Sequence, residues 1–155
     1  MTEETWSPEA IGQGLMAAGG SATLATLAPG GGPFASYVVT PPGADGSPLL
    51  LLSRLAVHSQ NLENDARASL LLVREAGDEA LAALRLTLTG RCVKHDEAAA
   101  RRLFLSRHPG AERYSSFADF TLYRFEIEAG QLVAGFGRIA SLTREALLGR
   151  PRGSE

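Results

Sequence analysis

The sequence predicts a mainly β protein, in which an antiparallel barrel has a few short helices laid over its openings. Short apolar segments, several with two-residue alternation, recur along the 155-residue chain and are separated by turns rich in glycine and proline. Most of these segments follow one another without an intervening helix, which argues against a doubly wound parallel sheet. Closing the sheet into a barrel would also remove exposed strand edges, which otherwise favour aggregation.

The first predicted element is a helix over 8–18, because Ser7 is a suitable N-cap and a proline occupies the first helical position. A β-hairpin follows, with strands over 22–28 and 34–40 joined by a glycine-rich turn. The next strand, 49–53, is apolar on both faces, and we therefore expect it to be central in the sheet.

The second half of the chain is predicted to contain further strands and two more helical segments. Over 84–93, leucines face one way while arginines and threonines face the other, which predicts a half-buried strand. Residues 96–105 begin with acidic side chains and continue with arginines, as the dipole of a helix favours. The other predicted elements are a helix over 59–65, strands over 68–73, 117–128 and 131–136, and one or two helical turns within 141–149.

Length and composition predict one domain, 1–155, made of the helix 8–18, a barrel over 20–137 and a short C-terminal tail over 138–155. Hydrophobic residues make up 45% of the chain, which is typical of a globular core. No apolar run approaches the ~20 residues of a membrane helix, and the acidic N-terminus has no signal region. With a single cysteine we expect a cytoplasmic protein without an internal disulfide.

The charges and motifs exclude several classes of function. The net charge of −2 lacks the basic excess of a nucleic-acid-binding protein. Cys92 lies on the leucine side of its strand, which predicts a buried structural thiol. His58, His95 and His108 are far apart in sequence and form no metal-binding motif, and no GxSxG, P-loop or GxGxxG occurs. The sequence therefore identifies no catalytic residue and no metal centre.

Two polar groups of residues are candidates for binding. One lies where the strand 49–53 ends and the next helix begins, and consists of Ser53, Arg54, His58, Ser59, Gln60 and Asn61. A helix N-terminus beside an arginine can bind phosphate, but the same spacing is equally consistent with plain helix capping. The other is Arg85 with Arg91, which belong either to a solvent-facing side of a sheet or to a wall beside a ligand or partner subunit.

The stretch 50–70, LLLSRLAVHSQNLENDARASL, resembles the pyridoxamine 5′-phosphate oxidase-like family of FMN-binding split barrels, and most closely its haem-utilisation branch. The most specific part is Ser-x-x-x-x-His-x-x-Asn-Leu, which runs from Ser53 to Leu62. Four shorter pieces agree with the family in order: GPFASY over 32–37, RLTLTG over 85–90, DFTLY over 119–123 and GFGR over 135–138. The resemblance covers roughly residues 8–140.

This resemblance implies a split antiparallel β-barrel that acts as a homodimer, with FMN at the subunit interface and a small-molecule substrate. The implied activity is that of an FMN-dependent oxidoreductase, in which the flavin carries out the redox chemistry. In the family, the end of the third strand and the following helix hold the flavin phosphate. Carried onto this chain, the implied cofactor-binding residues are Ser36, Tyr37, Ser53, Arg54, Leu55, His58, Gln60, Asn61 and Arg85.

The chain also departs from the oxidases of the family. His58 stands nearest the place of their lysine, and no histidine follows His108, so oxidation of pyridoxamine phosphate is not expected. The haem-linked branch supplies an alternative, a haem-binding or haem-degrading protein with His58 or His108 as axial ligand and Arg138 near the propionates. A non-enzymatic ligand-binding scaffold is a further alternative, because fold does not determine function.

Overall fold

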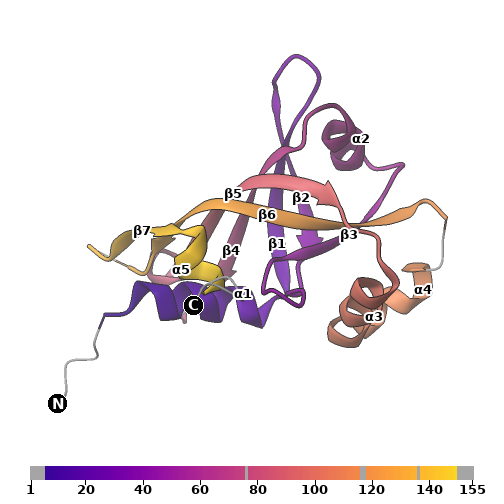
Figure 1. The fold of residues 1–155 in the computed structure, drawn as a ribbon. Coiled ribbons are helices and arrows are strands. Elements are labelled where there is room, and N and C mark those ends of the chain that lie inside the picture. The colour runs from indigo at the N-terminus through magenta and orange to yellow at the C-terminus, as the bar shows by residue number, and fades with distance from the viewer. Residues whose placement is uncertain (1–5, 76, 116–117, 136, 150–155) are drawn as a thin grey trace.

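The computed structural model describes residues 6–75, 77–115, 118–135 and 137–149 (Figure 1). Its strands are β1 Ser21–Leu27, β2 Pro33–Val39, β3 Leu49–Ser53, β4 Arg67–Arg74, β5 Leu84–Lys94, β6 Phe120–Val133 and β7 Ile139–Thr143. Its helices are α1 Pro8–Ala18, α2 Val57–Asn64, α3 Ala98–Arg107, α4 Glu112–Ser115 and α5 Arg144–Leu148, with short 3₁₀ turns η1 Ala80–Ala82 and η2 Pro109–Ala111.

All the strands belong to one curled antiparallel sheet with the order β2-β1-β4-β5-β6-β3, and β7 pairs with the end of β6. Its two edges, β2 and β3, approach each other, and the bonds found between them within the described ranges lie at one end. There the Leu49 N–H donates to the Pro41 carbonyl at 2.8 Å, and Pro42 forms an isolated bridge with Pro48. The predicted mainly β, antiparallel fold with flanking helices is confirmed, and the barrel is split between β2 and β3.

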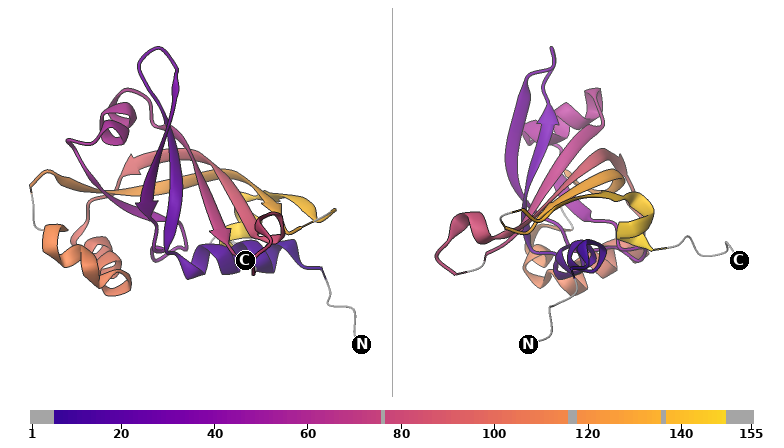
Figure 2. Two further views of the ribbon diagram at one scale, coloured as in Figure 1. Left: turned by 180° about the vertical axis from the view of Figure 1, so that it is seen from behind. Right: turned by 90° about the vertical axis from the view of Figure 1, so that its left-hand side faces the viewer.

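The barrel interior is filled by the alternating leucines of its strands and is closed by helices at both ends. Leu86 and Leu88 on β5 have no exposed surface, which confirms the alternation predicted for 84–93. Leu15 of α1 and Leu147 of α5 join this core from one end, and Leu62 of α2 joins it from the other. Figure 2 shows from two further sides that α1 lies below the barrel while α2 lies beside the β1–β2 hairpin.

The predicted buried thiol is also confirmed. Cys92 is only 3% exposed and packs within the barrel core. Burial raises the pKa of its thiol to about 12, because the thiolate would lose its hydration. The side chain therefore stays protonated at neutral pH and behaves as a small apolar residue.

Strand β3 lies at an edge of the sheet, so the prediction of a central position was wrong. Leu50 and Leu52 face the barrel interior, whereas Leu49 and Leu51 face a second apolar cluster that includes Phe104 of α3. A helix therefore covers the outer face of β3. An edge strand buried in this way has the same apolar pattern as a central one.

The segment from 120 onward forms one long strand, so the predicted turn at 129–130 was also wrong. Between β5 and β6 the register shifts beside Gly90, which leaves Glu128 as an extra residue on β6. Such a β-bulge bends a strand without ending it. A Cβ atom on Gly90 would lie 1.9 Å from the Glu126 carbonyl oxygen, so only glycine allows the two strands this close.

The C-terminal tail adds a strand to the sheet where the sequence predicted only helical turns. Strand β7 pairs with β6, and α5 then begins at a cap in which the Thr143 hydroxyl accepts from the Ala146 N–H at 3.1 Å. The sheet therefore extends beyond the boundary predicted for the barrel. Phe117 and Phe136, which were placed at strand ends, and residues 150–155 lie outside the described residues.

The predicted helices are confirmed, with boundaries shifted by two residues at most. At the start of α1, the Ser7 hydroxyl accepts from the Ala10 N–H at 3.4 Å, as its N-cap role requires. Within the described ranges, no helix has the length and apolar character needed to cross a bilayer.

Candidate functional site

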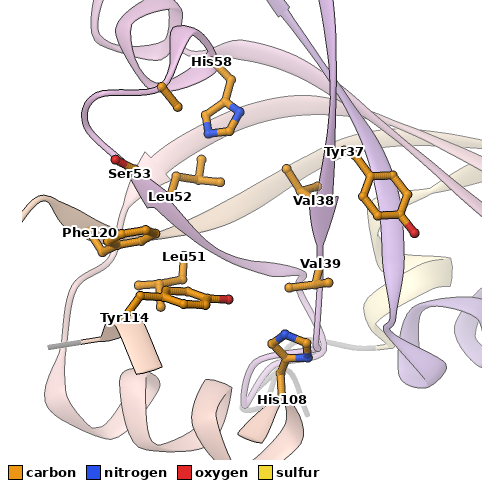
Figure 3. A pocket seen from close by; sticks show the side chains of 11 residues that line it. Tyr37, Val38, Val39, Leu51, Leu52, Ser53, His58, His108, Tyr114 and Phe120 are labelled. Carbon is orange, nitrogen blue, oxygen red and sulfur yellow. The ribbon is translucent and has the colours of Figure 1, made fainter. Parts of the chain in front are cut away.

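A cavity of about 290 Å³ occupies the split between β2 and β3 and is open to solvent. We call it the split cavity. Figure 3 shows how its side chains converge from strands, helices and connecting segments that are far apart in sequence. The lining residues are Tyr37, Val38, Val39, Leu51, Leu52, Ser53, Ala56, His58, His108, Tyr114 and Phe120.

The backbone at the border of this cavity is the free edge of a strand. In an antiparallel ladder, alternate residues direct both their N–H and C=O groups to the same side. On β2 the phase is fixed by the Thr40 N–H, which donates to the Gly20 carbonyl beside β1 at 2.8 Å. Val39 and Tyr37, which lie one and three residues before Thr40, therefore turn their backbone polar groups toward the split.

His58, in the first turn of α2, points into the split cavity with one nitrogen bound and the other without a partner. Its Nδ1 lies 3.0 Å from the Ser36 hydroxyl on β2. Its Nε2 is buried and has no hydrogen-bond partner among the described residues. Burial lowers the pKa of His58 below its usual range, because the charged imidazolium would be desolvated. The ring is therefore neutral at neutral pH and retains a lone pair.

His108 approaches the same cavity from another part of the fold. It follows α3 directly, and its backbone N–H donates to the Phe104 carbonyl at 2.9 Å. Its ring meets the Phe104 ring edge-on, with centroids 6.0 Å apart. In Figure 3, His58 and His108 lie on opposite sides of the cavity with aliphatic side chains between them. Two imidazoles thus border one largely apolar space.

An aromatic wall forms one side of the cavity. The rings of Tyr114 and Phe120 lie with their centroids 4.9 Å apart and their planes tilted by 36°. Arg101 of α3 holds this wall in place, because its Nη2 donates to the Phe120 carbonyl at 2.6 Å while also bonding to Asp96 at 3.0 Å. The Asp96 carboxylate in turn accepts from the Leu122 N–H at 3.4 Å, so α3 and β6 are joined beside the cavity.

The predicted phosphate-binding residues do not gather around one cavity. Ser53 lines the split cavity, but its hydroxyl donates to the Asp119 carboxylate at 2.9 Å. Arg54 is exposed and is not part of the lining. Gln60 is also exposed and donates to the carbonyl of Leu55, whose side chain is 77% exposed. FMN binding therefore stays a prediction.

Asn61, another predicted cofactor-binding residue, makes a buried contact within the protein. It is 3% exposed, and its Nδ2 donates to the Thr26 hydroxyl at 3.0 Å. Thr26 is itself 1% exposed, so the pair forms a buried bridge between α2 and β1. The Nδ2 group of Asn61 thus joins α2 to the sheet.

We expect Asn61→Leu to lower the free energy of unfolding by about 1–3 kcal/mol, because it leaves the buried Thr26 hydroxyl without its donor. Adding Thr26→Val should recover part of this loss, since an apolar pair needs no hydrogen bond. Urea unfolding of the two single variants and the double variant measures the coupling between the residues. Strictly additive losses would contradict a direct Asn61–Thr26 interaction.

The remaining predicted residues are divided between the cavity and another face. Ser36 contacts His58, and Tyr37, with 78% of its surface exposed, stands at the rim of the cavity. Arg85 lies on β5, away from the cavity, and its Nη2 donates to the Leu81 carbonyl at 3.5 Å. The sequence did not identify the aromatic wall, although Phe120 lies in the DFTLY piece that carried the resemblance.

Comparison with known proteins identifies relatives across most of the chain. The family model "CREG, beta-barrel" matches residues 10–147. The chloroplastic non-canonical haem oxygenase HOZ of Arabidopsis thaliana is 39% identical over 108 residues, which cover 68% of this chain and 33% of HOZ. The chain thus spans about a third of the length of that curated relative.

Solved structures resemble this fold closely. A haem-binding protein from Mycobacterium smegmatis is 32% identical with a TM-score of 0.86, and the match covers 94% of this chain and 62% of the other. HutZ, the haem storage protein of Vibrio cholerae, has a TM-score of 0.70 over 83% of this chain and 95% of its own. At 21% identity, HutZ shows a shared fold only. The chain therefore belongs to the CREG β-barrel family, and its relatives include proteins named for haem binding and haem oxygenation.

Proposed function

We propose that this protein binds haem in the split cavity, with His58 as an axial ligand of the iron. The observation that carries the proposal is the buried His58 Nε2, which lacks a partner among the described residues and belongs to a largely apolar cavity. Histidine is a common axial ligand, and an apolar surrounding suits the macrocycle. The haem-related names of the Arabidopsis and mycobacterial relatives support the same ligand.

The other residues around the cavity fit the remaining parts of haem. The rings of Tyr114 and Phe120 offer an apolar wall for a flat macrocycle. Arg54 directly follows the cavity residue Ser53, and its exposed guanidinium is suited to pair with a carboxylate at the rim. When bound, haem supplies an iron centre whose reactivity depends on its axial ligand and on the polarity around it.

Arg138, considered above for the propionates, does not fit this site. Its guanidinium lies over the ring of Trp6, 5.4 Å from the ring centroid. Phe120, at the cavity, begins β6, whereas Arg138 follows the end of that strand, which crosses the molecule in Figure 1. At ~3.4 Å per residue, the 14 residues of β6 separate the two ends by roughly 40 Å.

We also propose that a second copy of the chain covers the outer face of the sheet. Three rows of residues cross this face from strand to strand, and they are mostly apolar or hydroxyl-bearing. The rows are Tyr37–Thr23–Leu71–Thr87–Gln131–Ser141, Ala35–Ala25–Ser69–Thr89–Ala129–Thr143 and Val73–Arg85–Val133–Ile139. Leu71, Val73 and Ile139 on this face are 37%, 47% and 62% exposed, and apolar side chains exposed together on one face often mark an interaction surface.

Charge and shape on this face also favour a symmetric partner. Arg85 is the one charged side chain in the three rows, and its buried Nε has no partner within the described residues. A groove of about 780 Å³ runs over β5, β6 and β7, and Glu128 and Glu145 lie in its lining. In a two-fold dimer the same patch meets itself, so Arg85 of one copy can face an acidic side chain of the other. Tyr37 also lies in these rows, so the second copy would extend to the rim of the split cavity.

We expect Leu71→Glu to convert a dimer into monomers, because it buries a carboxylate opposite the uncharged Thr23 and Thr87. Light scattering coupled to gel filtration measures the mass directly. Ala98→Glu adds the same charge at an exposed position of α3 and should leave the mass unchanged. A wild-type protein that is monomeric at micromolar concentration would refute the proposed dimer.

A titration with haem tests the proposed function. We expect the visible spectrum of haem to change on binding and to saturate at one haem per chain. The same protein titrated with FMN tests the FMN prediction, since FMN at 100 times its dissociation constant would stabilise the fold by about 2.7 kcal/mol. Unchanged haem absorbance would refute the proposal, and a thermal shift with FMN alone would favour the flavin. Loss of the haem band in air with added ascorbate would extend the proposal to haem degradation.

A further inference from the structure

The contact that holds His58 also bears on which of its ring nitrogens can bind a metal ion. The Ser36 hydroxyl lies 3.0 Å from Nδ1, whereas Nε2 is buried without a partner among the described residues. In a neutral imidazole one nitrogen carries the proton and the other carries the lone pair. The direction of the Ser36 hydrogen bond therefore decides whether the nitrogen in the cavity is a donor or a ligand.

We infer that Ser36 accepts a hydrogen bond from Nδ1–H and thereby holds His58 in the tautomer whose Nε2 lone pair faces the split cavity. The inference rests on the proposed function, because this tautomer serves haem only if His58 is the axial ligand. Ser36 would then be a positioning residue, which acts on the iron through the imidazole and does not touch it.

Two features favour this direction of the bond. If Ser36 donated instead, the proton would be on Nε2, which is buried without an acceptor among the described residues. In proteins, a buried N–H group without an acceptor is rarer than a buried acceptor atom that receives fewer hydrogen bonds than it could. Ser36 is only half-buried, so its own O–H can still donate to solvent while its oxygen accepts from the ring.

Ser36 is also well placed to hold the ring in a fixed orientation. It lies on β2 opposite Leu24 of β1, within a ladder that pairs every residue of the strand. His58 belongs to the first turn of α2, which the buried Asn61–Thr26 bond joins to β1. Both partners of the contact are thus fixed to the same hairpin, which keeps the hydroxyl and the imidazole in register.

The tautomer can be measured without haem, by ¹⁵N NMR of the imidazole nitrogens in the uniformly labelled protein above the pKa of His58. The signals of His58 are identified by their loss in His58→Gln. We expect the wild type to show the Nδ1–H tautomer, Ser36→Ala to shift toward the Nε2–H form, and Ser36→Thr to keep the wild-type pattern. Ser21→Ala, an exposed serine on β1 outside the split cavity and outside the three rows, is the control and should change nothing.

Haem affinity provides the second readout. We expect Ser36→Ala to weaken haem binding by about 10- to 100-fold, the usual effect of removing the group that orients a ligating histidine, while Ser36→Thr restores it. An Nε2–H tautomer in the wild type would overturn the inference even if haem binds. Unchanged haem affinity in Ser36→Ala would overturn the positioning role. An Nδ1–H tautomer in a protein that binds no haem would instead leave the tautomer standing and refute the proposed function.

Discussion

Replacing His58 with alanine is expected to weaken haem binding by more than about 100-fold. Loss of a residue that merely orients a ligating histidine costs 10- to 100-fold, so loss of the ligand itself should cost more. The Nε2 of His58 is buried and lacks a hydrogen-bond partner within the described residues, so we attribute the expected loss of affinity to that atom. Titration of the visible haem spectrum measures the change.

Three comparisons separate ligation from a general loss of structure. His95→Ala is the matched control, because His95 lines a different cavity, near the start of α3, and its loss should leave haem affinity unchanged. Added imidazole should restore the haem spectrum of His58→Ala, since it can occupy the space left by the side chain. His108→Ala tests the opposite wall of the split cavity. Wild-type affinity in His58→Ala would show that another residue binds the iron.

Gly90→Ala is expected to lower the free energy of unfolding by about 3 kcal/mol or more, the upper end of the usual cost of overpacking. The added Cβ would lie 1.9 Å from the Glu126 carbonyl oxygen, which is backbone and cannot rotate away. Either the bulge between β5 and β6 must rearrange or the two strands must separate. For a chain of this length, a loss of that size lowers Tm by roughly 6–12 °C.

Gly32→Ala is the matched control for this measurement. Gly32 lies in the exposed β1–β2 turn, and a Cβ there would meet no atom within 4 Å. We expect its stability to remain within about 0.5 kcal/mol of the wild type. A Gly90→Ala protein with the Tm of the wild type would show that β5 and β6 are not packed as described.

The sequence was sufficient to predict the elements whose signal is local. The β1–β2 turn is an example, because Gly30 and Gly31 adopt φ angles of 89° and 92°, which favour glycine. Strand β5 is another example, because buried and exposed residues alternate along most of its length. In these cases the nearest neighbours in the chain determine the conformation.

The predictions were wrong where one local sequence pattern is consistent with two different tertiary environments. Gly130 resembled a turn residue, yet it lies inside β6, where a Cβ would come within 2.8 Å of the Leu147 side chain. Its lack of a side chain makes room for α5, which occurs later in the sequence. The apolar faces of β3 likewise fitted both a central strand and an edge covered by α3.

The same limit applies to the candidate site. The stretch from Ser53 to Asn61 contained His58, but its polar residues alone did not reveal which of them face the interior. Asn61 points inward because Thr26, 35 residues earlier in the chain, supplies its partner. The aromatic wall and His108 join the cavity only through the packing of α3 and β6, which no short motif encodes.

A crystal structure of the haem-loaded protein is the most direct test of the central claim. The account predicts a macrocycle lodged between β2 and β3 against the rings of Tyr114 and Phe120, with its iron bonded to Nε2 of His58. Haem bound on the outer face of the sheet, or an iron bonded to any other residue while the imidazole of His58 stays unbound, would contradict it.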